Sequence, residues 1–272
     1  MKNILMAAVA VTAIMVSGCQ GTVATGDDAA KTEASMTTDQ RDIGNRGAVM
    51  MAIQGLDRTD KDKENDEMRK AAEVLEFAGI WPGMTVVEME AGSGYYTDLM
   101  SRIVGENGKI IMQNPTAFDV FITAETMEAR LAPLSNVTLT KTNFDHLEAS
   151  KNSADVVTWF LGPHELFYIP DNGVALGDAE KTYAEIFRVL KPGGNFIVLD
   201  HAAAEGTPET SGGDTHRIDP ATVRAHAEKA GLVFVSSSKA LANAEDDHTL
   251  NVFNPEIRRK TDRFLHKYTK PK

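Results

Sequence analysis

The 272-residue sequence has a single cysteine and too few positive charges to balance its acidic residues. One thiol cannot form an internal disulfide, so the fold does not depend on disulfide bonds. The sequence has 28 lysines and arginines and 39 aspartates and glutamates, which gives a formal net charge of −11. An acidic chain without a basic patch repels phosphate groups, and nucleic acid is therefore excluded as an expected partner or substrate.

Long apolar runs are also missing, except near the N-terminus. After one lysine, residues 4–16 are almost all apolar, and two small residues then precede Cys19. This run falls short of the roughly 20 residues that a membrane-spanning helix needs. A basic residue, a short apolar run and small residues are the layout of an export signal, which we expect over residues 1–18.

The segment from Val16 to Cys19 resembles the lipobox of bacterial lipoproteins, in which cleavage leaves an acylated cysteine at the new N-terminus. The resemblance implies that Cys19 is lipidated and tethers the chain to a membrane, since two lipid signals already give stable anchoring. Gln20 resembles the second residue of lipoproteins sorted to the outer membrane, facing the periplasm of the cell envelope. A free thiol or a bridge to another chain are the other roles open to Cys19.

The next stretch has almost no large apolar side chain. We expect a flexible linker over residues 19–45, because this composition cannot bury enough surface to hold one conformation. The rest of the chain has the length and apolar content for one core, so a single domain is expected over residues 46–272. The charged run of residues 56–70 indicates a solvated helical face, with a lid over an active site as the alternative.

From residue 71 onward, helical and strand patterns alternate. Helical patterns cover residues 71–78, 97–104 and 118–131, a stretch from Asp178 to a stop at 191–194, and a stretch from Asp219 to Gly231. Strand patterns cover residues 85–89, 110–112, 137–139, 154–161, 196–199, 232–235 and 264–268. Strands separated by helices predict βαβ units and a mainly parallel sheet. In the last strand we expect Phe264, His266 and Tyr268 in the core, and Leu265 and Lys267 on the surface.

Two glycines follow the first strand, in residues 88–97, which read EMEAGSGYYT. Glycines at a strand-to-helix turn let the backbone approach a ligand closely, although a tight structural turn also uses them. A nicotinamide dehydrogenase would need a third glycine where Thr97 stands, and this disfavours an oxidoreductase. Tyr95 and Tyr96 open the helix that follows. They either stack on a ligand or, as we expect, pack against the charged N-terminal helix.

This turn resembles motif I of class I S-adenosylmethionine-dependent methyltransferases. Residues 188–196, RVLKPGGNF, resemble the junction before the fifth strand of that superfamily, and residues 230–264 resemble a group of predicted exported bacterial methyltransferases. The resemblance extends from Ala71 over nearly all of the remaining chain. It implies a Rossmann-like fold, in which a seven-stranded, mainly parallel sheet has helices on both faces.

The resemblance also implies S-adenosylmethionine as cofactor. Glu88 ends the first strand and would orient the ammonium group of the cofactor, and the adenine would lie after the third strand. The implied cofactor residues are Glu88, Glu90, Gly92, Gly94, Thr97, Asn114, Asn143 and Asp145. Glu90 replaces the usual first glycine, and a left-handed backbone there would cost roughly 1–2 kcal/mol. Asn114 replaces the acidic residue that accepts the ribose hydroxyls, and an uncharged acceptor is about half as strong.

Two histidines follow strands at the edge where α/β folds bind ligands. His164 and His201 are the candidate catalytic residues, because a histidine titrates near neutral pH and can accept a proton from a methyl acceptor. A plain loop histidine is the alternative for each. No histidine or cysteine has the spacing of metal ligands, so no metal is expected.

The sequence thus predicts an enzyme that transfers a methyl group from S-adenosylmethionine to a small or envelope-associated acceptor. The alternative is a non-catalytic binding or scaffold lipoprotein of the cell envelope, which has kept the fold but lost the cofactor. Glu90 and Asn114 favour this alternative, as does the doubtful supply of S-adenosylmethionine outside the cytoplasm.

Overall fold

The computed structural model describes residues 38–169 and 173–272. Its elements in chain order are α2 (Thr38–Ile53), α3 (Asp60–Met68), α4 (Ala71–Ala78), β1 (Thr85–Met89), α5 (Tyr95–Val104), β2 (Lys109–Gln113), the 3₁₀ helix η1 (Thr116–Val120), α6 (Ala124–Leu131), β3 (Val137–Thr140), β4 (Ala154–Phe160), the 3₁₀ helix η2 (Pro163–Phe167), α7 (Ala179–Val189), β5 (Leu190–His201), α8 (Ser211–Thr215), α9 (Pro220–Lys229), β6 (Val233–Ser238) and β7 (Arg263–Thr269).

The expected signal segment, Cys19 and most of the expected linker lie outside the described residues. Helix α2 begins at Thr38, so the linker boundary expected at residue 45 falls inside a helix. Within the described ranges, no helix combines the length and the apolar character needed to span a bilayer.

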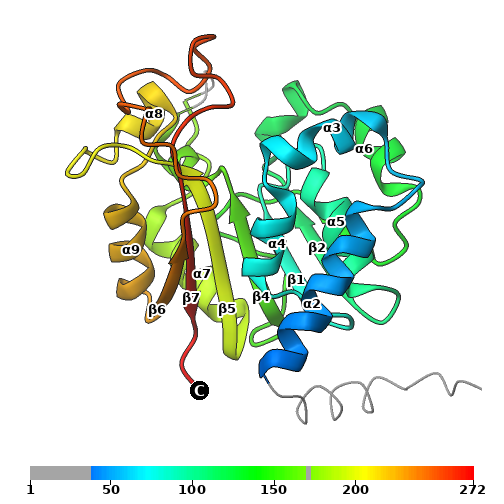
Figure 1. Cartoon of the computed structure of the whole chain (residues 1–272). Coiled ribbons are helices and arrows are strands. Elements are labelled where there is room, and N and C mark those ends of the chain that lie inside the picture. Colours follow the sequence, from blue (N-terminus) through cyan, green and yellow to red (C-terminus); the bar gives the residue numbers. More distant parts are fainter. Residues whose placement is uncertain (1–37, 170–172) are drawn as a thin grey trace, which may run out of the picture.

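The strands form one seven-stranded sheet in the order β3-β2-β1-β4-β5-β7-β6 (Figure 1). Neighbouring strands are parallel from β3 to β5, and β7 runs antiparallel to both β5 and β6. This confirms the expected mainly parallel, Rossmann-like sheet. The chain order reverses between β1 and β4, and open sheets of this kind hold ligands outside the carboxyl ends of the strands at such a point.

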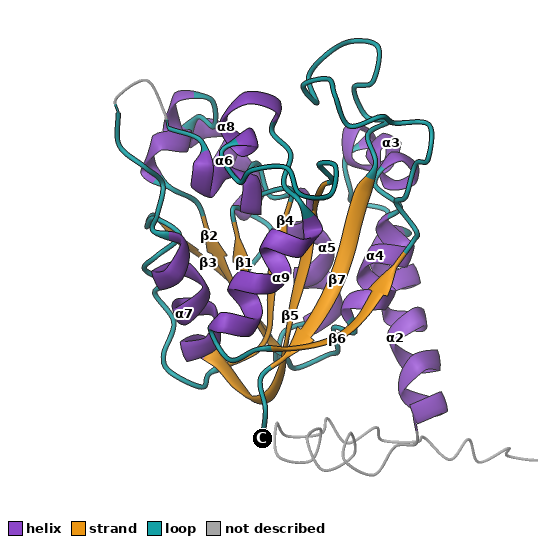
Figure 2. Ribbon diagram, turned by 90° about the vertical axis from the view of Figure 1, so that its left-hand side faces the viewer, coloured by secondary structure: helices purple, strands orange, loops and turns teal. Residues whose placement is uncertain are grey.

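Helices cover both faces of the sheet, and the strands therefore bury side chains on both sides. Val86 of β1 packs in a cluster with α2, α4 and α5, whereas Val87 packs in a second cluster with α6, α7 and α9. Helix α9 crosses in front of the strands in Figure 2. The expected surface position of Leu265 is wrong for this reason, because the α2–α5 layer buries it completely.

Two connections differ from the predictions. The expected helix over residues 118–131 is divided into η1 and α6, and the Thr123 hydroxyl caps α6 by accepting from the Thr126 amide. The expected turn at 191–194 lies inside β5, because α7 ends at Val189 and the strand begins at once. These residues form an irregularity in the pairing with β4, between Leu190 and Asn195.

The expected helix starts at two aspartates are confirmed. The carboxylate of Asp178 accepts from the Lys181 amide at the start of α7, and that of Asp219 accepts from the Ala221 amide at the start of α9. Each side chain satisfies an amide that has no partner within its own helix.

The charged run forms α3 and the turn before it, and it is not a fully solvated face. Arg58 and Asp62 are 4% and 5% exposed. Arg58 donates two hydrogen bonds to the Asp66 carboxylate, both 2.7 Å long, while Asp62 accepts two from Arg130 of α6. The expectation of solvation is therefore wrong for these residues, because Asp66 and Arg130 supply charged partners for them. Closure of α3 as a lid stays a prediction.

Candidate functional site

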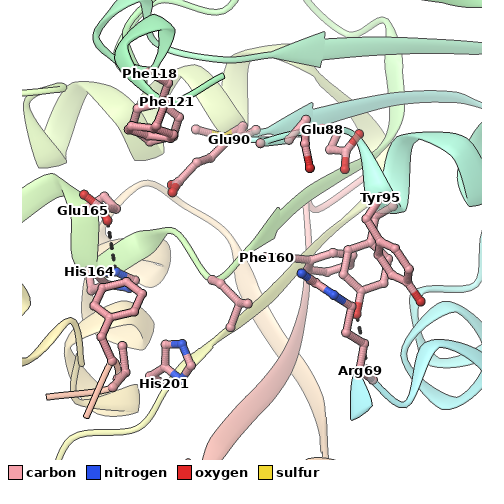
Figure 3. Close-up of a pocket in the computed structure, with 18 residues that line it drawn as sticks. Arg69, Glu88, Glu90, Tyr95, Phe118, Phe121, Phe160, His164, Glu165 and His201 are labelled. Carbon is pink, nitrogen blue, oxygen red and sulfur yellow. Dashed lines mark hydrogen bonds and ion pairs between the residues drawn. The ribbon is translucent and has the colours of Figure 1, made fainter. Parts of the chain in front are cut away.

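A cavity of about 430 Å³ lies at the carboxyl edge of the sheet, where β1 and β4 end side by side (Figure 3). Its walls come from the turn after β1, from η1, from the ends of β4 and β5, from η2 and from residues 252–253. The volume is within the roughly 300–1,000 Å³ of cavities that hold small ligands. The cavity lies at the switch point of the sheet, where a ligand is expected.

Glu88, at the end of β1, presents a buried carboxyl group to this cavity. The side chain is 3% exposed, and its Oε2 accepts a hydrogen bond of 2.5 Å from the Thr97 hydroxyl. Burial raises the pKa of Glu88 to about 8, although this hydrogen bond opposes the effect. Thr97 itself lies inside α5 and is fully buried, so it positions Glu88 and does not line the cavity.

Glu90 has a left-handed backbone with φ of 51°, and the conformational cost predicted for a non-glycine residue therefore applies. Its Oε2 accepts from the Trp159 indole at 3.0 Å, and its amide donates to the Gln113 side chain. The carboxyl group points across the cavity toward Glu165 (Figure 3). Burial, and then the negative charge of Glu165, raise the pKa of Glu90 well above its usual value.

Asn114 braces the glycine turn instead of facing the cavity. Its side-chain oxygen accepts from the Gly92 amide and its nitrogen donates to the Gly92 carbonyl, each at 2.9 Å. Asn114 is completely buried. Gly92 needs its freedom for a φ of 59°, and Gly94 begins α5 as its N-cap. The structure thus brings Glu88, Glu90 and Gly92 to the cavity but leaves Asn114 and Gly94 behind its wall.

The residues expected near adenine lie elsewhere. Asn143 lines a separate cavity of about 320 Å³ beside η1, and Asp145 accepts a hydrogen bond from the amide of Asp178 at the start of α7. Phe118 and Phe121 line the main cavity instead, with ring centroids 4.8 Å apart. These two aromatic rings were not predicted, and their only signal in the sequence is their place directly after the second strand.

Tyr95 and Tyr96 form the opposite wall. The Tyr95 hydroxyl donates to Asp66 of α3 at 2.6 Å, and the Arg69 guanidinium lies 4.6 Å from the Tyr95 ring centre. Tyr96 packs edge-on against Phe160 of β4. The expected packing against the charged N-terminal helix is confirmed, and both tyrosines also border the cavity.

His164 lies in the first turn of η2 and against Asp200, which is completely buried at the end of β5. Asp200 accepts from the His164 amide at 2.9 Å and contacts its Nδ1 atom at 2.8 Å. Burial alone would lower the pKa of His164, but Asp200 and Glu165 outweigh it and raise the pKa to about 10. A raised pKa favours the charged form of His164 at neutral pH, which suits orienting an acceptor better than removing its proton. The catalytic role of His164 stays a prediction.

His201 is the other candidate catalytic residue, and it also lines the cavity. Its Nδ1 lies 2.7 Å from the Thr261 hydroxyl. Burial, and then the charge of His164, lower the pKa of His201 well below its usual value. His201 is therefore a neutral imidazole at neutral pH, as a proton acceptor must be.

Two further residues, neither of them predicted from the sequence, join this site. Glu165 follows His164 and lines the cavity, and His216 ends α8 with its ring 5.3 Å from that of His164, centre to centre. The expectation of no metal rested on spacing along the sequence. Folding brings His164, Glu165 and His216 together, and their ligand atoms all lie within 4.8 Å of one another.

The residues at the turn suit the amino-acid end of S-adenosylmethionine. No heavy atom lies within 4 Å of the point where a Cβ of Gly92 would be, so the backbone leaves room for a ligand there. Glu88 offers a carboxyl group to an ammonium group, and Phe118 and Phe121 offer apolar rings to a base. The cofactor therefore fits the cavity, although the Asn114 side chain points away from the ribose position expected for it.

Comparison with known proteins agrees with this fit. Residues 80–250 match the family model of the methyltransferase domain. The ubiquinone/menaquinone biosynthesis C-methyltransferase of Salmonella arizonae is 29% identical over 126 residues, which are 46% of this chain and 46% of that protein. The enzyme of the same description from Haemophilus ducreyi is 25% identical over 126 residues, 46% of this chain and 44% of that protein. The chain spans about half the length of these curated relatives.

Solved structures show the same fold. A SAM-dependent methyltransferase from Aquifex aeolicus superposes with a TM-score of 0.54 and 19% identity, over 78% of this chain and 98% of that chain. Geranyl diphosphate C-methyltransferase from Streptomyces coelicolor, solved with S-adenosyl-L-homocysteine, gives a TM-score of 0.56 and 14% identity, over 80% and 88% of the two chains. The shared architecture is the class I methyltransferase fold.

Proposed function

Because this chain belongs to the methyltransferase-domain family, we propose that it transfers a methyl group from S-adenosylmethionine to a small acceptor. The observation that carries the proposal is the cavity at the switch point of the sheet, with the Glu88 carboxyl group at one side and His201 at another. When bound, S-adenosylmethionine supplies a methyl group already activated on a positively charged sulfur. The protein then mainly has to hold the acceptor in line with that methyl group.

The residues around the cavity would have different roles in this reaction. Glu88 would pair with the ammonium group of the cofactor, and the turn at Gly92 would lie along its amino-acid end. His201, as the neutral imidazole, would accept a proton from the acceptor when the acceptor has to lose one. His164 carries a positive charge instead, and it would attract a negatively charged acceptor group.

A second, adjoining cavity supports an anionic acceptor. It has a volume of about 260 Å³ and shares Leu161, His201 and Phe253 with the first cavity. Four arginines line it: Arg69, Arg258, Arg259 and Arg263. Within the described part of the chain, none of the four makes a salt bridge, and the buried Nε of Arg263 has no hydrogen-bond partner. In a chain with a net charge of −11, such a cluster favours an acceptor with a carboxylate or phosphate group.

The acceptor class can be tested by methyl labelling. Small molecules and lipids from a bacterial extract would be separated by anion exchange and incubated with the protein and methyl-labelled S-adenosylmethionine. We expect the label in the retained, anionic fractions. Label confined to the neutral fractions would contradict an anionic acceptor while leaving methyl transfer intact.

The competing function is a non-catalytic binding or scaffold protein. One observation favours it: the Asn114 amide is engaged with Gly92, so this side chain does not accept the ribose hydroxyls of a cofactor. Calorimetric titration with S-adenosylmethionine and S-adenosylhomocysteine separates the two functions. Micromolar binding supports the enzyme, whereas no heat at millimolar ligand supports the scaffold.

A pair of glycine variants shows whether such binding uses the proposed turn. Gly92 and Gly83 both have a left-handed φ, 59° and 85°, and both have open space where a Cβ would lie. Gly92→Val and Gly83→Val therefore introduce similar backbone strain, but only Gly92 borders the cavity. Binding should be lost in Gly92→Val and kept in Gly83→Val. Equal loss in both variants would mean that the strain, and not the site, is responsible.

We further propose that the protein is exported and held at the bacterial cell envelope by a lipid on Cys19. The support is the sequence alone, in which a short apolar run ends at the lipobox-like segment from Val16 to Cys19. An acceptor associated with the envelope would suit this location.

A further inference from the structure

Two short helices bring a group of possible metal ligands together beside the cavity. His164 and Glu165 belong to η2, and His216 directly follows α8. The two helices touch at Gly212, where a Cβ would lie only 2.3 Å from the His164 carbonyl oxygen. A side chain at position 212 would push them apart, so the glycine permits the approach that places His216 next to His164.

The distances within this group suit a shared ion better than direct hydrogen bonds. Glu165 Oε1 lies 3.3 Å from His164 Nε2 and 3.4 Å from His216 Nδ1. Good hydrogen bonds from nitrogen to oxygen are about 2.7–3.2 Å long. Ligands about 2.0–2.1 Å from a tetrahedral Zn²⁺ lie about 3.3 Å apart. Two of the three distances are therefore close to those between ligands of one ion, and all three ligand atoms lie within 4.8 Å of one another.

His216 provides an independent observation. Its Nδ1 atom is buried, and within the described part of the chain no hydrogen bond reaches it. The side chain is 17% exposed, and the backbone is left-handed with φ of 53°. Buried polar atoms nearly always have a partner, so an atom held without one beside a carboxylate and a second imidazole needs an explanation. A metal ion at this point supplies it.

Asp200 provides the support that metal-binding histidines usually have. Its completely buried carboxylate contacts His164 Nδ1 at 2.8 Å. This contact fixes the ring so that Nε2 faces Glu165. A carboxylate on the far nitrogen of a ligating histidine orients the ring and strengthens it as a ligand.

We infer that His164, Glu165 and His216 form a binding site for a divalent transition-metal ion such as Zn²⁺. The ion would displace the proton from His164 Nε2, so the positive charge that His164 carries without a metal would be replaced by that of the ion. Two imidazoles and one carboxylate are a ligand set used for zinc and ferrous iron, and such sites keep open positions for water or substrate. His164 and Glu165 border the cavity, and the His216 ring packs on Phe253 of its wall. Under the proposed function, the open position would bind an oxygen of the methyl acceptor, but the metal site itself does not depend on that function.

The test is metal binding by the full chain without a histidine tag and without cofactor. After treatment with a chelator, Zn²⁺ would be titrated by calorimetry and the bound metal counted by mass spectrometry. We expect one Zn²⁺ per chain and no comparable binding of Mg²⁺, which prefers oxygen ligands. Glu165→Gln and His216→Gln should each weaken Zn²⁺ binding by at least about tenfold.

His248→Gln is the matched control. His248 also has a left-handed backbone, with φ of 64°, and its ring contacts Asp262, so it is not one of the three ligands. Zinc binding should be unchanged in this variant. The inference is overturned if the wild type binds no Zn²⁺, or if both ligand variants bind it as tightly as the wild type.

A measurement on the wild type alone covers the case in which a ligand variant fails to fold. X-ray absorption of the zinc-loaded chain should show two imidazole nitrogens at about 2.0–2.1 Å together with oxygen ligands. A zinc coordination shell without imidazole nitrogens would overturn the inferred site. Because no cofactor is present, the result is independent of methyl transfer, and either proposal can fail without the other.

Discussion

Glu88 lies at the end of β1 with almost no contact with water, and burial controls its chemistry. Its pKa is raised to about 8 from an ordinary value of 4.5. The carboxyl group is therefore mostly protonated at pH 7 in the folded chain. In the unfolded chain it ionises near pH 4.5, so its contribution to stability is present below that pH and is lost as the pH rises through 8. A nearby ammonium group would favour the ionised form.

This gives a pH-dependent prediction for cofactor binding. Because the ammonium pairs with the carboxylate, binding must displace the Glu88 proton, and affinity for S-adenosylmethionine should rise by up to about tenfold per pH unit below the pKa. Calorimetry from pH 6 to 7 measures this slope and stays below the titration of the cofactor's own ammonium. The slope should vanish in Glu88→Gln and persist in Glu106→Gln, whose side chain is exposed. A flat or falling affinity in the wild type would contradict the pairing.

Among single residues, the sequence predicted which residues of the turn line the cavity, but it did not predict the contacts that neighbouring residues make. Glu88 and Gly92 could be selected because they end a strand and begin a turn. The role of Asn114 could not be predicted, because its side-chain amide forms hydrogen bonds with the backbone of Gly92, 22 residues away in sequence. His216 was missed because it joins His164 only through the packing of α8 on η2.

Helices α3 and α6 are joined across the glycine turn by one arginine. Arg130 of α6 donates to both carboxylate oxygens of Asp62, at 2.7 and 3.0 Å, and its Nε donates to the Ser93 carbonyl at 3.0 Å. The two side chains are only 17% and 7% exposed, so water screens the pair weakly. These contacts hold α3 against the edge of the cavity.

Loss of this pair should lower stability more than loss of a surface pair. Asp62→Asn is expected to lower the free energy of unfolding by about 1.5–3 kcal/mol, because the buried arginine loses its charged partner. Glu228→Gln breaks the exposed Arg224–Glu228 pair and should cost less than about 1 kcal/mol. Urea unfolding measures both values. Similar costs for the two variants would show that the Arg130–Asp62 pair is no stronger than a surface contact.

At the scale of elements, the strands and most helices followed from their apolar patterns and caps. The failures occurred where tertiary packing decides. Residues 191–194 have the composition of a turn, yet pairing beside β4 includes them in β5. Leu265 was predicted at the surface because successive side chains of β7 point to opposite faces of the sheet. Helices cover both faces, however, so both sets of side chains can be buried. A pattern along one strand cannot show how many layers cover it.

For the whole molecule, the proposed anchor gives a separate prediction. Cys19→Ser removes the thiol that would be acylated, so the variant should move from the membrane fraction to the soluble fraction, since several acyl chains are needed for stable attachment. Fractionation followed by immunoblotting measures this. Gln20→Ser, which leaves the thiol in place, should remain in the membrane fraction. A Cys19→Ser variant that still sediments with membranes would place the anchor elsewhere.

The proposed function requires the turn after β1 to bind S-adenosylmethionine. A crystal structure of the chain with S-adenosylhomocysteine, the thioether that remains after methyl transfer, is the decisive measurement. We predict ligand density in the cavity of about 430 Å³, with the amino group of the ligand within hydrogen-bond distance of Glu88 and its sulfur facing the side of His201. Binding of the ligand elsewhere, or a cavity filled by Glu90 and Phe121 at saturating ligand, would overturn the proposed function.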